Sequence, residues 1–208
     1  DNSANISYKT FRVIRGENKA SIKINSKNHN CDQFTYLLGK LDFTIRKFIQ
    51  GNKTCWTIPL NMNDRQNIQT GNHIGFLFYR YNPQKDYQYN FNQIRKKIFL
   101  GIVWGPVYTM YLIKLLGKKI TSRIITFLPY IQFNTGAFSY MKNLGFHDEY
   151  MVGYTPVTST QPFSIIIGEF QETLVLCLHA HSKICKNQDY LEHIADTYLK
   201  NILAVKNS

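Results

Sequence analysis

The 208-residue sequence lacks the short motifs that identify many common enzymes and binding modules. It has no Gly-x-Gly-x-x-Gly or P-loop segment for nucleotide phosphates and no Gly-x-Ser-x-Gly nucleophile elbow. It also has no zinc-finger, RNP or basic-zipper pattern, so we do not expect nucleic acid as a partner. Its four cysteines, at positions 31, 55, 177 and 185, include no Cys-x-x-Cys pair. We therefore expect reduced, mostly buried thiols and no bound metal.

Acidic residues are scarce: 13 Asp and Glu stand against 25 Lys and Arg, which gives a formal net charge of +12 and a pI near 9.5. Such a balance suggests an anionic neighbour, for instance a membrane surface or a phosphate-bearing ligand. The basic residues are dispersed, however, and the tightest cluster is only Arg95, Lys96 and Lys97. A solvated positive surface without a partner explains the same pattern.

Hydrophobic residues are plentiful at 44%, and charged residues make up only 18%, so the chain should fold into a globule with a sizeable core. We treat residues 1–208 as a single domain. The sequence starts at Asp1 rather than Met, which we interpret as a processed or truncated piece, and no signal peptide is visible. We expect a cytoplasmic protein. Association of this protein with a membrane surface is the alternative.

Hydrophobic periodicity predicts an alternation of helices and strands. Residues 31–50 place their apolar positions on one helical face, with Asn30 or Asp32 as the N-cap. A closing helix is expected over residues 190–204, opened by a capping box of Asp189 and Glu192. Strands are expected over residues 8–15, 19–24, 55–60, 73–80, 127–133, 150–157, 163–169 and 173–180. The first two should form a hairpin around residues 16–18, and the whole pattern indicates an α+β sandwich with a mixed sheet.

Residues 98–116 are almost entirely apolar, and only Lys114 interrupts them. A membrane span needs about 20 apolar residues, so the length is borderline. Because Pro106 sits in the middle, we expect a kinked, buried helix pair. The other interpretation is a hydrophobic ligand wall or a face that contacts a membrane.

Two short segments combine an apolar strand with turn residues. "IPLNMN" at 58–63 is followed by "GNHIG" at 71–75, and "FNTG" closes a strand at 133–136. Asn and Asp hydrogen-bond local backbone groups, and Gly lets the backbone pass close to a neighbour. Taken alone, Asn61 and Asn72 are better explained as ordinary turn residues, and the 133–136 segment is explained equally well as an ordinary surface turn.

In their order and spacing these segments resemble the C-terminal half of chloramphenicol-acetyltransferase-like acyltransferases, a superfamily with condensation domains, wax ester synthases and alcohol acetyltransferases. The resemblance covers residues 8–204. It implies a two-layer sandwich with a mixed sheet and flanking helices. It also implies a turn at the interface between the two halves, formed by Pro59, Asn61, Arg65, Gly71, Asn72 and Gly75. Asn63 stands where the family often has Arg, and an Arg follows two residues later, at Arg65.

The resemblance implies acyl transfer from a CoA or carrier-protein thioester to a hydroxyl or amine acceptor. The co-substrate would be acyl-CoA or the phosphopantetheine of an acyl carrier protein, with no bound cofactor. The substrate tunnel would be bordered by Asn134, Thr135, Gly136, Ser139 and Tyr140. Partners would be the N-terminal half of the same enzyme, and a carrier protein or membrane surface.

The catalytic His-His-x-x-x-Asp signature of this superfamily is absent. The nearest text is "LHAHSKICKNQD" at 178–189, in which His179 and His181 lie two residues apart and Cys185 stands where Asp is expected. On a strand the two side chains share a face. They are the only catalytic candidates in the chain, and two ordinary histidines at a strand end explain them as well. A non-catalytic relative that binds a lipid, a partner or an anionic surface is the alternative function.

Overall fold

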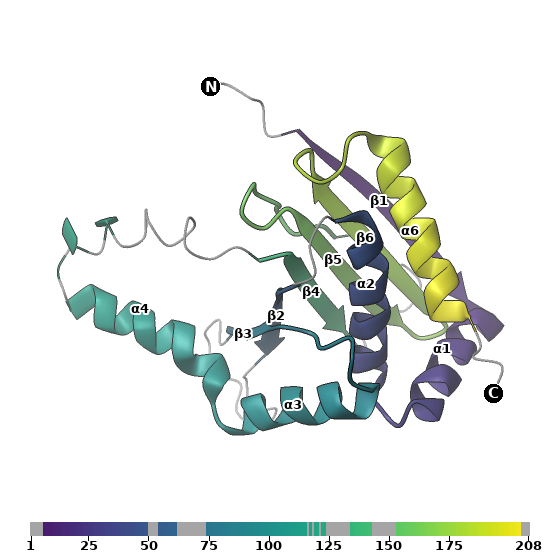
Figure 1. Cartoon of the computed structure of the whole chain (residues 1–208), viewed down its shortest axis with the longest axis horizontal. Coiled ribbons are helices and arrows are strands. Elements are labelled where there is room, and N and C mark those ends of the chain that lie inside the picture. The colour runs from purple at the N-terminus through teal and green to yellow at the C-terminus, as the bar shows by residue number, and fades with distance from the viewer. Residues whose placement is uncertain are drawn as a thin grey trace.

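A six-stranded mixed sheet forms the centre of the molecule, in the strand order β1-β6-β5-β4-β2-β3 (Figure 1). The computed structural model describes residues 6–49, 54–61, 74–115, 117, 119–120, 122–123, 134–142 and 153–204. The strands are β1 Ser7–Arg15, β2 Trp56–Asn61, β3 Ile74–Tyr79, β4 Gly136–Met141, β5 Phe163–Phe170 and β6 Thr173–His181. β4 pairs in parallel with β2 and β5, and the other pairs are antiparallel. The predicted α+β class and mixed sheet are confirmed.

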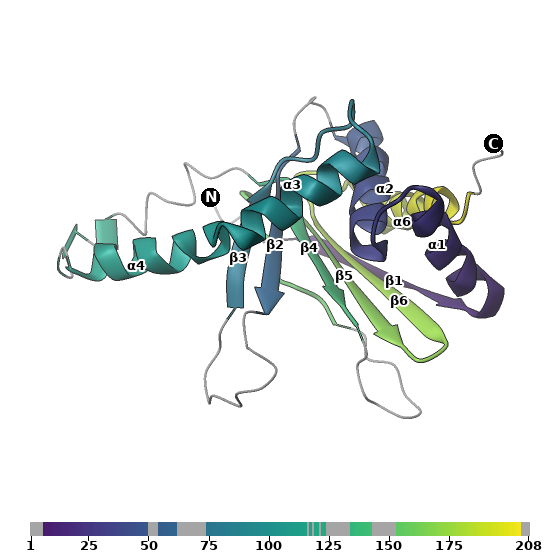
Figure 2. The same cartoon turned by 90° about the horizontal axis from the view of Figure 1, so that it is seen from below.

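The helices gather on one side of this sheet (Figure 2). They are α1 Gly16–Asn28, α2 Gln33–Phe48, α3 Tyr87–Phe99, the 3-10 helix η1 Ile102–Trp104, α4 Gly105–Leu115 and α6 Gln188–Leu203. In both views α1, α2 and α6 cover the sheet, whereas α4 extends past the edge strand β3. No helix of the described residues is long and apolar enough to cross a bilayer.

Helix α2 is the central element of the helical layer. Of the two predicted caps, Asp32 is the one that starts the helix, because its Oδ1 accepts a hydrogen bond from the backbone N of Thr35 at 2.8 Å. The helix then buries one apolar face completely, including Leu37, Leu38 and Leu41. These side chains fill the space between sheet and helix, where removing large apolar areas from water gives the fold most of its stability.

Strand register decides which side chains enter this layer. Trp56 pairs with Gly136 and Gly136 with Phe163, so these positions share one face of the sheet. Trp56 and Phe163 are fully buried, and the ring of Phe138 lies 5.1 Å from Phe34 of α2. The alternate residues of each strand consequently face away from the helices.

Two deeply buried tyrosines join α2 to α6. The hydroxyl of Tyr198 donates to the carbonyl oxygen of Leu37 at 3.1 Å, and that of Tyr36 donates to Ile202 at 3.0 Å. A buried hydroxyl without a partner would be costly, so these bonds let large rings fill the core at no such penalty.

The prediction of a hairpin at residues 8–24 was half wrong. Residues 8–15 do form β1, but residues 16–28 form α1 and not a second strand. Gly16 adopts a left-handed φ of 56° at this corner, so the turn residue was recognised and the element after it was not. Ile22, Asn25 and Ser26 are the buried positions of α1, a helical spacing of three and four with only one apolar member.

Three further predictions need correction. Residues 153–157 form no strand, and residues 150–152 and 124–133 lie outside the described part of the chain. Asn187 and not the capping box starts α6, because its side chain accepts from the N of Tyr190. The apolar stretch 98–116 does break into η1 and α4, but the side chains described in it are largely exposed and not buried: Phe99 is 90% and Leu115 82% accessible.

Candidate functional site: the open face of the sheet

The side of the sheet opposite the helices is the candidate site, and we call it the open face. The described residues place no helix on it (Figure 2). Strand alternation puts the following side chains there: Phe11, Thr57, Pro59, Phe76, Ser139, Ser164, Cys177, His179 and His181. Among the described residues, it is the large surface of the sheet that no helix covers.

An irregular segment, residues 153–161, covers the β5–β6 part of the open face. Tyr154 packs on a small apolar cluster that includes Val175 and Cys177. At the other end, the N of Asn134 donates to Thr160 O at 3.2 Å. The segment therefore restricts access to β6 and also reaches the start of β2, where the hydroxyl of Thr57 donates to Gln161 Oε1 at 3.4 Å. The exposed part of the face lies farther along the sheet, at Phe76 and Met141, which are 40% and 39% exposed.

His179 holds this segment in place. Its Nδ1 lies 2.6 Å from the carbonyl oxygen of Thr155, which is an acceptor, so Nδ1 carries the proton. Nε2 is buried and has no hydrogen-bond partner in the described structure. Burial lowers the pKa of His179; the bond to Thr155 opposes the shift, and the charges of Lys9 and His181 add to it. The ring is thus held neutral beneath the segment.

His181 lies at the end of β6, on the same face as His179, as the spacing predicted. Its Nδ1 accepts a hydrogen bond from the N of Lys183 at 3.0 Å within the turn that follows. No group of three or more His, Cys, Asp or Glu side chains in the described part of the chain is placed to hold a metal ion. The two histidines are each tied to local backbone and not to each other.

The predicted tunnel segment begins beside the first residues of β2. The N of Thr135 donates to Cys55 O at 2.8 Å, and the hydroxyl of Thr135 accepts from the N of Cys55 at 2.9 Å. Asn134 and Thr135 are buried, and the bend at Thr135 leads directly into β4 at Gly136. This bend therefore lies at the centre of the sheet, where β2, β4 and β5 meet.

Ser139 and Tyr140 point to opposite faces of β4. Tyr140 shares the helix-side register with Phe138, and its hydroxyl donates to Glu169 at 2.6 Å. Glu169 in turn pairs with Lys19 of α1 at 3.4 Å. Ser139 is half-buried and faces the open side. Of these two residues, only Ser139 is therefore placed on the open face.

The predicted inter-half turn falls only partly on described residues. Pro59, on the open face, pairs with Phe76, Gly75 with Leu60, and the backbone of Asn61 ends β2. Arg65, Gly71 and Asn72 lie outside the described residues. β2 ends and β3 begins at the same end of the sheet, where Asn61 pairs with Ile74.

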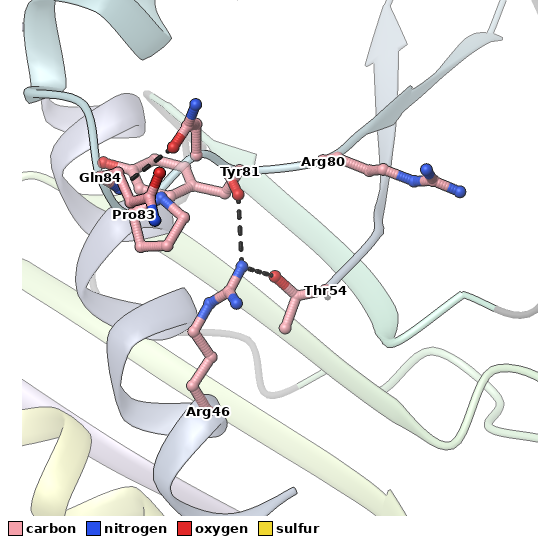
Figure 3. A pocket seen from close by; sticks show the side chains of 7 residues that line it. Arg46, Thr54, Arg80, Tyr81, Pro83 and Gln84 are labelled. Atoms are coloured by element: carbon pink, nitrogen blue, oxygen red, sulfur yellow. Dashed lines mark hydrogen bonds between the residues drawn. The ribbon is translucent and has the colours of Figure 1, made fainter. Parts of the chain in front are cut away.

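A pocket that the sequence did not suggest lies between the end of α2 and the β3–α3 connection (Figure 3). It measures about 650 Å³ and is lined by Arg46, Thr54, Arg80, Tyr81, Asn82, Pro83 and Gln84. Arg46 is already engaged: its Nε donates to Asp42 at 2.5 Å and Nη2 to Thr54 at 2.6 Å. Figure 3 shows Arg80 pointing away from Arg46, so the two guanidinium groups do not converge on one ligand position.

Three solved structures have this sheet and helix arrangement, two from nonribosomal peptide synthetases and one from a polyketide synthase. The epimerization domain from the third module of tyrocidine synthetase B superposes with a TM-score of 0.61 at 12% identity, over 95% of this chain and 47% of that one. The condensation domain from the monacolin K polyketide synthase MokA gives 0.64 at 9% identity, over 95% and 46%. The cyclization-docking bidomain of EpoB from Sorangium cellulosum gives 0.61 at 12%, over 98% and 43%.

The chain folds like one half of a condensation domain. This likeness confirms the predicted resemblance at the level of the fold. The chain spans less than half the length of these structures although nearly all of it is matched. No family model and no curated protein matches the sequence.

Proposed function

We propose that this chain is the C-terminal half of a two-halved acyltransferase of the condensation type. The proposal rests on the extent of one structural match: about 95% of this chain superposes on only about 46% of a condensation domain. The open face is where a complementary half would dock. The reaction would move an acyl group from a CoA or carrier-protein thioester to a hydroxyl or amine.

In this proposal the chain supplies one wall of the substrate tunnel. Asn134, Thr135 and Gly136 would border it at the centre of the sheet, and Ser139 would face it. Tyr140 was also predicted at the tunnel, but its hydroxyl is engaged by Glu169 on the helix side. We therefore assign Tyr140 a packing role behind the wall. The turn from Pro59 to Gly75 would contact the complementary half.

The general base would come from the complementary half. A general base must present an accessible lone pair within about 3 Å of the proton it removes. His179 fails this requirement, since its free nitrogen is buried and its other nitrogen is bound to Thr155. His181 is the remaining histidine at that strand end, and its Nδ1 is engaged by Lys183.

The test is thioester cleavage by the chain alone and together with a polypeptide carrying His-His-x-x-x-Asp from the same source. Release of free thiol from an acyl-CoA and from an acyl-pantetheine would be followed in the presence of an amine or alcohol acceptor. The isolated chain should show no turnover above background, since a general base contributes about 10²–10⁴-fold in rate. The assembled pair should release thiol from the thioester. Replacing the second histidine of the partner's His-His-x-x-x-Asp motif by alanine should abolish this activity.

The variants His179→Gln and His181→Gln separate the two sources of the base. Both should leave turnover by the assembled pair within about tenfold of the unmodified pair, a smaller loss than removal of a general base causes. Turnover by the isolated chain that disappears in His181→Gln would reject the proposal. It would assign the base to this chain.

A further inference from the structure

The surface formed by the α3–α4 corner carries half of the exposed large apolar side chains in the described residues. Seven of the fourteen lie within 22 residues of sequence, and we call them the apolar arm: Phe99, Leu100, Ile102, Tyr108, Tyr111, Leu115 and Ile120. The other seven are distributed over six different strands and helices and the chain's first described residue. Apolar groups concentrated in this way mark an interaction surface, whereas single exposed ones do not.

Helix α4 presents its share of the arm as a stripe. Tyr108, Tyr111 and Leu115 are 63%, 61% and 82% exposed and stand at positions i, i+3 and i+7, which lie on one helical face. Ile113 is 6% exposed and lies on the opposite side. The helix therefore packs inward through Ile113 and directs an aromatic and aliphatic edge outward.

The same region has charge of only one sign. From residue 87 to residue 147 the sequence contains eight Lys and Arg and no Asp or Glu. Lys96, Lys119 and Arg123 are exposed and flank the apolar arm in sequence. Exposed apolar groups bordered by cations, without a single carboxylate nearby in sequence, complement a surface that is apolar inside and anionic outside.

We propose that the apolar arm docks on the surface of a membrane that contains anionic lipids. An aromatic and aliphatic edge would enter the boundary between head groups and acyl chains, and the flanking cations would pair with lipid phosphates and carboxylates. α4 has 11 residues and is about 16 Å long, roughly half of an apolar bilayer core, so it would lie in the interface. This proposal does not depend on acyl transfer by the open face.

Two other occupants fit the arm less well. A complementary half would dock on the open face, whereas α4 continues from the end of α3 and runs beyond the edge strand β3 (Figure 2). Single-stranded nucleic acid would use the cations and stack on Tyr108 and Phe99, but it gains little from exposed aliphatic groups such as Leu115. An anionic membrane uses all three kinds of side chain, because its acyl chains contact the aliphatic and aromatic groups and its head groups pair with the cations.

The experiment is flotation of the 208-residue chain with phosphatidylcholine vesicles, with and without phosphatidylserine, in a density gradient. Self-associated protein sediments, so only vesicle-bound protein floats. The chain should float with the anionic vesicles, and raising the salt from about 0.1 to about 1 M should weaken binding because it shortens the screening length from about 10 to about 3 Å. Phe99→Ser with Leu115→Ser should weaken binding by about tenfold or more.

The matched apolar control is Ile24→Ser with Phe43→Ser, two residues exposed to 57% and 53% on α1 and α2. These changes should leave flotation unaltered. For charge, Lys96→Gln, Lys119→Gln and Arg123→Gln together should weaken binding by roughly 100-fold, at about 5-fold per charge. The control with the same change in net charge is Lys23→Gln, Lys27→Gln and Lys200→Gln, which should have a much smaller effect.

Circular dichroism of every variant would establish that it is folded. Equal losses in the arm and control triples would mean attraction by net charge alone and would overturn the proposal. The same holds if the unmodified chain does not float with anionic vesicles. An arm variant that loses binding to a single-stranded oligonucleotide but floats like the unmodified chain would assign the arm to nucleic acid instead.

Discussion

The imidazole of His179 and the carbonyl of Thr155 are joined by a 2.6 Å contact that fixes an irregular segment onto a sheet. Ser164, opposite His179 in the register, donates to the same carbonyl oxygen at 3.2 Å. One carbonyl thus collects two side-chain donors from neighbouring strands. His179, a catalytic candidate in the sequence, therefore positions the segment that contains Thr155. Because the ring can gain a proton, this contact depends on pH.

Stability should fall as the solution is acidified through the range in which His179 titrates. Burial lowers the pKa of His179 below its ordinary value of 6.5, so in that window the unfolded state binds more protons than the folded state. Folding stability then rises with pH and is lost as pH falls below about 6.5, by at most about 1.4 kcal/mol per pH unit for one proton. Urea midpoints measured between pH 5 and pH 8 would give this slope.

The variant His179→Gln should flatten this slope, because Gln has no proton to gain in that range. The control is the exposed His193 on α6: His179→Gln should change the slope more than His193→Gln does. An unchanged slope in His179→Gln would contradict the assignment of the pH dependence to this residue.

Cys55 should react with iodoacetamide before Cys31, although both thiols are half-buried. Burial raises the pKa of both, and Asp32 adds to it for Cys31, which reaches about 12. At Cys55 the neighbouring Arg80 opposes the effect of burial. Since the thiolate is the reactive form, timed alkylation at pH 8 with mass spectrometry of the peptides should show this order. Arg80→Gln should slow labelling of Cys55 and not of Cys31; faster labelling of Cys31 in the unmodified chain would contradict the argument.

The sequence predicted an element correctly where a long hydrophobic periodicity ended at a residue that can cap a helix. The apolar positions of residues 31–50 and the cap at Asp32 together predicted α2 to within two residues at each end. The strands β5 and β6 were found because they are apolar on both sides, with nearly every residue of β6 buried. In these elements local preference and tertiary burial favour the same structure.

Prediction failed where burial depends on distant partners. Residues 19–24 alternate like a strand, yet α1 buries Ile22 together with the polar Asn25, whose amide donates to Ile202 O at 3.3 Å. No local sequence pattern predicts this contact between residues 177 positions apart. The exposure of Phe99 and Leu115 was missed for the opposite reason, because an apolar run is normally read as core. Ser139 and Tyr140 were grouped by sequence, but strand alternation separates them.

Gly136 should not tolerate a side chain. A Cβ at this position would lie 2.9 Å from the carbonyl carbon of Phe163 and closer still to its oxygen. Neither backbone can move freely, since Gly136 is paired with β2 on one side and β5 on the other. Gly136→Ala should lower the free energy of unfolding by about 2 kcal/mol or more, measured by urea denaturation. Gly105→Ala, which meets no atom within 4 Å at the start of α4, should be neutral or stabilising by up to about 1 kcal/mol; equal effects of the two changes would contradict the packing argument.

Among the carboxylates of the described residues, Asp42 should be the one whose loss costs the most stability. Its side chain is 1% exposed and accepts from Arg46 Nε at 2.5 Å, from Trp56 Nε1 at 2.9 Å and from the hydroxyl of Thr54, so it joins α2 to β2. Asp42→Ala would leave three donors, one of them charged and largely buried, without their acceptor. Removing one member of a buried ion pair costs about 3–5 kcal/mol.

Asp196 is the matched control, because it pairs with Arg12 at 2.8 Å but is 54% exposed. Asp196→Ala should cost at most about 1 kcal/mol. Urea denaturation of both variants measures the difference, and a loss for Asp42→Ala no larger than that for Asp196→Ala would mean that burial does not strengthen this ion pair.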